Sequence, residues 1–167
     1  MLDSISDIKV FALSASVLYI KFLLSTMIQG RKAFAANTRL PEDKTLVCSM
    51  GINVDKDEKA VKAAVEDEMR WKRIIQNDLE SMPLAFVVFW SAIAVGVSPA
   101  ITKTLLLAYT VARASHTAVY SLVMPRARMV CWMAGSFCIV VAALNCVAVA
   151  LMYLFLNTVV PVFESLF

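Results

Sequence analysis

The stretch RWKRIIQNDLESMP, residues 70–83, decides the fold, because it sets a dense group of charges directly against an uncharged run, residues 82–97. Charged side chains therefore meet hydrocarbon at this point of the chain. On a helix, Arg73, Asn77 and Glu80 are spaced by four and three residues and share one face. We expect this face to bind something polar where the helix enters the membrane.

The composition indicates a membrane protein, because 60% of the 167 residues are hydrophobic, more than one soluble core of this size could bury. The apolar residues gather into four segments, each near the roughly 20 residues that cross a bilayer as a helix. We therefore predict an all-α integral membrane four-helix bundle in a single domain, 1–167. The predicted helices are 8–32, 58–97, 101–124 and 127–157, and the predicted long cytosolic loop is 33–57.

Basic residues predict the orientation of the bundle. Ten Lys or Arg lie in the loop after the first segment and at the base of the second, and Arg126 and Arg128 lie between the last two segments. The opposite side has little beyond Lys9 and Lys103. By the positive-inside rule, the basic loops are cytosolic and both termini lumenal. The same rule explains the basic pI, so nucleic-acid binding gains no support.

The four cysteines do not predict a metal site, because the chain has no C-x-x-C pair and only one histidine. Cys131, Cys138 and Cys146 lie in the last apolar segment and are interpreted as small hydrophobic residues. Cys48 lies in a polar loop, where it is either an inert residue or an exposed, modifiable thiol.

A second polar group lies on the third segment, where Arg113, His116 and Tyr120 share one helical face. An arginine at the bilayer centre costs about 2.5 to 3.5 kcal/mol on insertion scales, so such a residue either serves a site or is paired. The structural alternative pairs Arg113 with Asp78 or Glu80 across two helices. In the first segment, Lys21 must reach the membrane surface or face the protein interior.

These polar groups should converge near the cytosolic surface, because the second and third segments are joined at their lumenal ends. Several guanidinium groups together with a carboxylate, an amide and a phenol suit a small anionic or zwitterionic peptide. Glutathione fits this description. Its carboxylates would bind arginines, its amino group would bind Glu80, and its thiol would need a nearby positive charge to ionise.

Four motifs resemble the membrane-associated proteins in eicosanoid and glutathione metabolism. They are RKAFA from Arg31, the PED sequence ending at Asp43, QNDLE from Gln76, and ARASHTAVY ending at Tyr120. The resemblance implies a homotrimer that binds glutathione between subunits at the cytosolic side. It implies that Arg128 steadies the glutathione thiolate and that Asp43 matches an aspartate of the prostaglandin E synthase branch. The implied glutathione-binding residues are Arg73, Asn77, Glu80, Arg113, His116, Tyr120 and Arg128.

Departures from these motifs favour one branch of the family. The prostaglandin synthase pattern has a serine and a tyrosine where this chain has Met129 and Trp132. The leading hypothesis is therefore a glutathione transferase of the endoplasmic reticulum membrane, with possible peroxidase activity toward lipid hydroperoxides. Its second substrate would be a hydrophobic electrophile from the bilayer. The alternatives are a glutathione-dependent prostaglandin E synthase, a non-catalytic lipid-binding activator and a purely structural membrane module.

Overall fold

The computed structural model describes residues 6–43 and 57–164, and the regular secondary structure within them is helical throughout. No strand occurs in these segments, which confirms the predicted all-α class. Four long helices and one short 3-10 helix are present there: α1 (Asp7–Ala35), η2 (Pro41–Asp43), α3 (Glu58–Ala94), α4 (Pro99–Ser121) and α5 (Pro125–Glu164).

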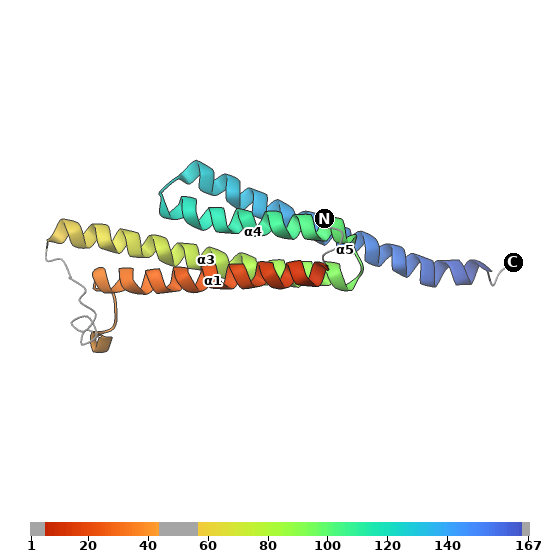
Figure 1. Cartoon of the computed structure of the whole chain (residues 1–167), viewed down its shortest axis with the longest axis horizontal. Helices are drawn as coiled ribbons and strands as arrows, with labels where there is room; N and C mark the ends of the chain where they lie inside the picture. Colours follow the sequence, from red (N-terminus) through yellow and green to blue (C-terminus); the bar gives the residue numbers. More distant parts are fainter. Residues whose placement is uncertain (1–5, 44–56, 165–167) are drawn as a thin grey trace.

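The helices form a bundle in which α1 lies beside α3, and α4 lies beside α5 (Figure 1). Both α3 and α4 pack against the other three long helices of the described chain, so they are the inner pair. One end of the bundle contains the last turn of α1, the first turns of α3 and the connection between α4 and α5. We call it the basic end, because Arg31, Lys32, Arg73 and Arg128 lie there.

The inner helices end earlier than the sequence predicts, because residues in the left-handed backbone region stop them. Gly96 has φ +78°, and α3 ends at Ala94 instead of the predicted 97. The amide of Val97 donates to the carbonyl of Ala92 at 3.0 Å, which closes the helix with a pattern that favours glycine. Proline suits the first turn of a helix, so α4 begins at Pro99 rather than 101.

The connection between α4 and α5 is the tightest turn near the basic end. Val123 has φ +60°, a conformation that β-branched residues rarely adopt. The amide of Val123 donates to Tyr120 O at 3.2 Å, and the amide of Met124 donates to Val119 O at 3.0 Å. Helix α4 therefore ends at Ser121 rather than 124, and Pro125 starts α5 two residues before the predicted 127.

Helix α5 is longer than predicted and extends past the end of the bundle opposite the basic end (Figure 1). It continues to Glu164, seven residues beyond the predicted 157. Among the described residues, α1 and α5 are the two helices whose length and hydropathy suffice to cross a membrane. Their apolar side chains are mostly exposed, as expected for helices that face lipid and enclose a more polar inner pair.

The centre of the bundle is apolar. Leu18 of α1, Phe89 of α3, and Leu106 and Tyr109 of α4 are fully buried. The rings of Phe89 and Tyr109 lie 5.8 Å apart, and the Tyr109 hydroxyl is 3.0 Å from the hydroxyl of Ser81. This core determines which faces of α3 and α4 turn toward each other. It thereby also sets the direction of their polar residues nearer the basic end.

Candidate functional site

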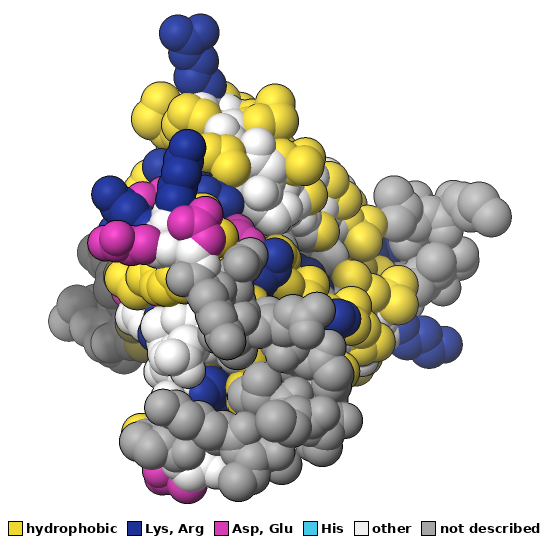
Figure 2. Space-filling model, turned by 90° about the vertical axis from the view of Figure 1, so that its left-hand side faces the viewer, with side chains coloured by type: hydrophobic (Ala, Val, Ile, Leu, Met, Phe, Trp, Pro, Cys, Tyr) yellow, Lys and Arg dark blue, Asp and Glu magenta, His cyan; other side chains and the backbone are white. Residues whose placement is uncertain are grey.

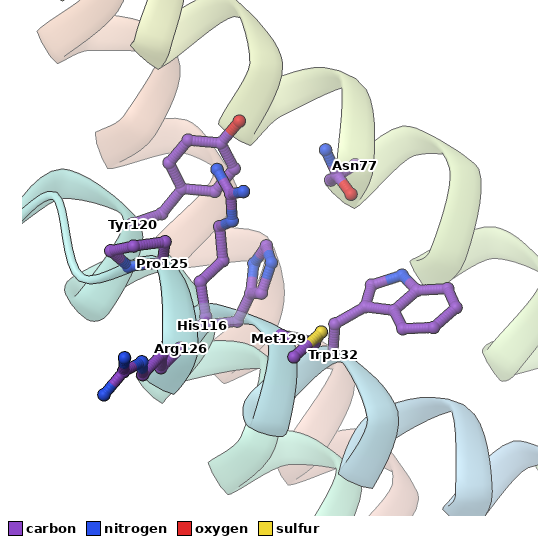
Figure 3. Close-up of a pocket in the computed structure, with 8 residues that line it drawn as sticks. Asn77, His116, Tyr120, Pro125, Arg126, Met129 and Trp132 are labelled. Carbon is purple, nitrogen blue, oxygen red and sulfur yellow. The ribbon is translucent and has the colours of Figure 1, made fainter.

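A pocket of about 550 Å³ lies near the basic end, where α3, α4 and the first turns of α5 meet (Figure 3). Four of the residues expected to bind glutathione line it: one from α3, two from α4 and one from α5. The full lining is Asn77, His116, Tyr120, Pro125, Arg126, Arg128, Met129 and Trp132. We call this the main pocket.

Aromatic contacts fix the cationic side of the main pocket. The Arg128 guanidinium lies over the Tyr120 ring, 4.4 Å from its centroid, a cation–π geometry. The His116 ring meets Tyr120 edge to face, with centroids 5.6 Å apart. The short turn between α4 and α5 makes the first contact possible, because it brings the last turn of α4 against the first turn of α5, whereas His116 and Tyr120 meet because they are four residues apart on α4.

The opposite side of the main pocket is apolar. Trp132 and Met129 of α5 lie across from Asn77 of α3, whereas the side chain of Arg126 points away from the other labelled residues (Figure 3). Trp132 comes four residues after Arg128, so the two share one face of α5. This spacing is visible in the sequence, where Trp132 is otherwise notable only as a departure from the prostaglandin synthase motif.

Arg73 faces a second pocket, of about 390 Å³, which shares Tyr120 and Arg128 with the main pocket. Arg70, which the sequence analysis did not assign to the site, also lines it. The view onto the basic end shows Lys, Arg, Asp and Glu side chains gathered beside apolar ones (Figure 2). Tyr120 and Arg128 therefore belong to both pockets, and the second pocket contains more charged residues than the main pocket.

Two expected site residues lie outside these pockets. Glu80 is exposed on α3, and one of its carboxylate oxygens accepts a hydrogen bond from the Gln76 amide at 2.9 Å. Asp43 of η2 pairs with Arg39 at 3.8 Å and lines none of the pockets described here. The single chain thus does not bring Glu80 or Asp43 together with Arg128, and their roles stay predictions.

Arg113 is buried behind the main pocket in an ion pair with Asp78, one of the alternatives that the sequence left open. Arg113 Nη2 donates to Asp78 Oδ1 at 2.5 Å, and Lys21 Nζ lies 2.6 Å from Asp78 Oδ2. The side chains of Lys21, Asp78 and Arg113 are 13%, 0% and 2% exposed. We call these residues the buried trio. Lys21 therefore faces the protein interior, and its partner Asp78 was not foreseen.

Some buried polar atoms of the trio and of His116 make no hydrogen bond in the described parts of the chain. Nζ of Lys21 and Oδ2 of Asp78 contact each other as an ion pair, whereas Nε of Arg113 and Nδ1 of His116 have no hydrogen-bond partner there. Because buried polar groups are normally satisfied, such atoms indicate a place where a polar ligand or water completes the structure. His116 also lines the main pocket, so this place adjoins it.

The three cysteines that the structure describes do not line these pockets. Cys131, Cys138 and Cys146 carry free thiols along α5, and Cys48 lies outside the described residues. Within residues 6–43 and 57–164, no group of three or more His, Cys, Asp or Glu side chains is arranged to hold a metal ion.

Comparison with known proteins identifies the family of the chain. A model of the MAPEG family matches residues 10–159, which is most of the chain. No curated protein and no solved structure matched the sequence. The family contains glutathione-dependent enzymes, among them glutathione transferases and prostaglandin E synthases. With four helices, two of them long and apolar, and a family match over nearly its whole length, this chain is a membrane protein that belongs to the MAPEG family.

Proposed function

We propose that this protein is a membrane-bound glutathione transferase that joins the glutathione thiolate to hydrophobic electrophiles. One observation carries the proposal: Asn77, His116, Tyr120 and Arg128 line a single pocket that also has an apolar wall. The arrangement offers one place for a small polar thiol and an adjacent place for an apolar partner. Holding both reactants in a productive orientation can supply much of a rate enhancement.

Arg128 is the residue that we assign to thiol activation. A guanidinium next to a thiol favours the thiolate, which is the nucleophilic form. The contact with the Tyr120 ring holds the Arg128 guanidinium at the pocket. In the reaction, the thiol loses its proton to water, its sulfur forms a bond to the electrophilic carbon, and the leaving group departs with the bonding electrons.

The remaining polar residues would bind the peptide part of glutathione. The unpartnered nitrogen atoms of His116 and Arg113 provide places for carboxylate or carbonyl oxygens. Arg73 and Glu80 are exposed in the single chain, so a neighbouring subunit could complete their environment. We therefore also propose the homotrimer that is typical of the family, with glutathione bound between subunits.

The second substrate would be lipophilic and would enter from the bilayer. Met129 and Trp132 form the apolar wall of the main pocket on α5, a helix that also exposes many large apolar side chains along its outer face. Lipid hydroperoxides are substrates of the same physical kind, so a peroxidase activity is part of the proposal. We place the protein in the endoplasmic reticulum membrane, with the basic end cytosolic and both termini lumenal.

The transferase is favoured over the isomerase by the residue after Arg128. Met129 lines the main pocket, and its thioether offers no hydroxyl to assist an endoperoxide rearrangement. Asp43, the residue associated with the prostaglandin E synthase branch, lies outside this pocket in the single chain. Analysis of products from an endoperoxide and from an aromatic halide would separate the two activities.

The proposal is tested by an ultraviolet difference spectrum at the thiolate absorbance, recorded on mixing the purified protein with glutathione at neutral pH. We expect a thiolate signal in the wild type and its loss in Arg128→Ala, with turnover falling far more than glutathione affinity. Arg31→Ala is the matched control, because it removes an exposed arginine at the same end of the bundle. Its signal should equal that of the wild type.

Two results would contradict the proposal in different ways. Equal losses of affinity and turnover in Arg128→Ala would mean that Arg128 binds glutathione without activating its thiol. No thiolate signal and no retained glutathione in the wild type would instead favour the non-catalytic lipid-binding activator.

A further inference from the structure

The buried trio carries an unbalanced charge. It contains the ammonium of Lys21, the guanidinium of Arg113 and a single carboxylate, that of Asp78. Each oxygen of this carboxylate is assigned to a different cation, Oδ1 to Arg113 and Oδ2 to Lys21. One negative charge cannot neutralise two positive charges, so the trio has a net charge of about +1 when its members are ionised.

This excess charge lies one helical turn from a residue that lines the main pocket. His116 follows Arg113 by three residues on the same face of α4, and His116 lines the pocket. Nε of Arg113 has no hydrogen-bond partner in the described chain, so part of its guanidinium is uncompensated. Charges act over longer distances in a buried, low-dielectric environment than in water. The positive potential of the trio should therefore extend into the main pocket.

Asp78 and Arg113 do not need Lys21 to neutralise each other's charge. Asp78 and Arg113 alone would form a neutral pair, with both carboxylate oxygens free to bind the guanidinium. Burying an additional ammonium group carries a desolvation cost that a neutral pair avoids. A purely structural role for Lys21 therefore leaves this added charge unexplained, whereas attraction of an anion explains it.

We propose that Lys21 is a positioning residue that acts through Asp78 to keep the main pocket selective for anionic ligands. By binding Oδ2 of Asp78, Lys21 restricts the carboxylate to one contact with Arg113 and leaves the guanidinium partly uncompensated. The ligand class is a small molecule with a carboxylate group. Naming glutathione as that ligand rests on the proposed function, but the electrostatic role of Lys21 does not.

The first experiment measures equilibrium binding of glutathione and of its diethyl ester, which lacks both carboxylate charges. In Lys21→Met we expect glutathione affinity to fall about tenfold, equivalent to 1.4 kcal/mol, with ester affinity unchanged or improved. Lys21→Arg should retain the wild-type preference. Lys9→Met is the matched control, because it removes the same charge from an exposed position on the same helix.

The second experiment measures the potential of the pocket without glutathione. Trp132 lines the main pocket, so in a Trp71→Phe/Trp90→Phe background its fluorescence reports on ions that enter there. Lys21→Met should lower quenching by iodide about twofold or more and leave quenching by neutral acrylamide unchanged. If Lys21→Met folds poorly, Lys21→Gln makes the same test with a side chain that can still donate a hydrogen bond to Asp78.

Unchanged iodide quenching in both variants, or equal losses for iodide and acrylamide, would overturn the role of Lys21. Equal losses of glutathione and ester binding would likewise leave Lys21 a structural tether between α1 and α3. If the wild type binds neither glutathione nor its ester, the proposed function fails, while the iodide measurement still decides whether Lys21 sets the charge of the pocket.

Discussion

Two clusters of charged residues join α1 to α3, and each contains one Lys, one Asp and one Arg. They differ in how deeply they are buried. The buried trio consists of Lys21, Asp78 and Arg113, and the second cluster, the rim trio, consists of Lys32, Asp67 and Arg70. Lys32 follows Lys21 by eleven residues, and Asp67 precedes Asp78 by eleven. Eleven residues are about three helical turns, so antiparallel packing of the two helices repeats the same Lys–Asp contact.

The clusters differ in burial and in the origin of the arginine. The side chains of Lys32, Asp67 and Arg70 are 43%, 28% and 27% exposed, and Arg70 lies one turn from Asp67 on the same helix. In the buried trio, the arginine comes from a third helix and all members are nearly inaccessible. Solvent screens the charges of the rim trio but not those of the buried trio. The same three residue types should therefore contribute very different amounts to the free energy of unfolding.

The largest effect is expected from Asp78→Asn. This change leaves the Lys21 and Arg113 cations buried without a carboxylate. Breaking a buried ion pair in this way typically lowers the free energy of unfolding by about 3–5 kcal/mol. Unfolding of the purified protein by denaturant in detergent would measure it. A loss below about 1 kcal/mol would mean that water reaches the trio, and the contrast with the rim trio would disappear.

The next largest effect is expected when the buried trio is replaced as a unit. Lys21→Met, Asp78→Leu and Arg113→Met together remove every buried charge of the cluster. Such apolar replacements are often neutral or stabilising by about 1–4 kcal/mol. The same unfolding measurement should therefore show a triple variant more stable than Asp78→Asn, although it should bind glutathione weakly. A triple variant as unstable as Asp78→Asn would show that the trio is required for the fold itself.

A smaller effect is expected from Gly135→Ala, which tests how tightly the buried trio is enclosed by α5. A methyl group on Gly135 would lie 3.7 Å from Arg113 Cδ and 3.7 Å from the Tyr109 ring, an ordinary van der Waals distance. Alanine is favoured over glycine inside a helix by about 0.8–1.0 kcal/mol. The thermal unfolding midpoint should therefore rise. A fall would show that α5 leaves no space beside the trio.

The smallest effect is expected from Asp67→Asn in the rim trio. Exposed ion pairs contribute about 0.2–1 kcal/mol, and salt screens them. Unfolding measured in low and in 1 M salt should show a small loss that shrinks as the salt concentration rises. The loss in Asp78→Asn should change little with salt. If the loss of unfolding free energy in Asp67→Asn did not depend on salt, the rim trio would be as poorly screened by solvent as the buried trio.

The fold was largely predictable because its main signals are local in the sequence. Apolar length predicts each helix, and the charges of α3 predict that this helix begins before the apolar run. Helix ends were less accurate. Val123 adopts a left-handed conformation without the glycine that normally signals it, and α5 continues beyond the predicted 157 through Pro161, a residue that normally disfavours the interior of a helix.

Sharing a predicted helical face brought some of the predicted site residues into one pocket but not all of them, because Glu80 lies outside the pocket that Asn77 lines. His116 and Tyr120 lie together because they are four residues apart, and the turn after α4 adds Arg128. The contact between Lys21 and Asp78 joins residues far apart in the chain, and no spacing rule encodes it. Asp78 also had a plausible rival as the partner of Arg113, namely Glu80, and only the rotation of α3 in the bundle decides between them.

The length of α5 links the protein to the thickness of the bilayer. Its 40 residues span about 60 Å, twice the roughly 30 Å of the hydrocarbon layer. The exposed residues 151–156 near its far end are all apolar, so water is a poor environment for them. A transmembrane helix that is longer than the hydrocarbon layer can tilt, and its tilt increases as the layer becomes thinner. Because the main pocket is built on the first turns of α5, we expect the tilt of α5 to change the orientation of the pocket relative to the membrane surface.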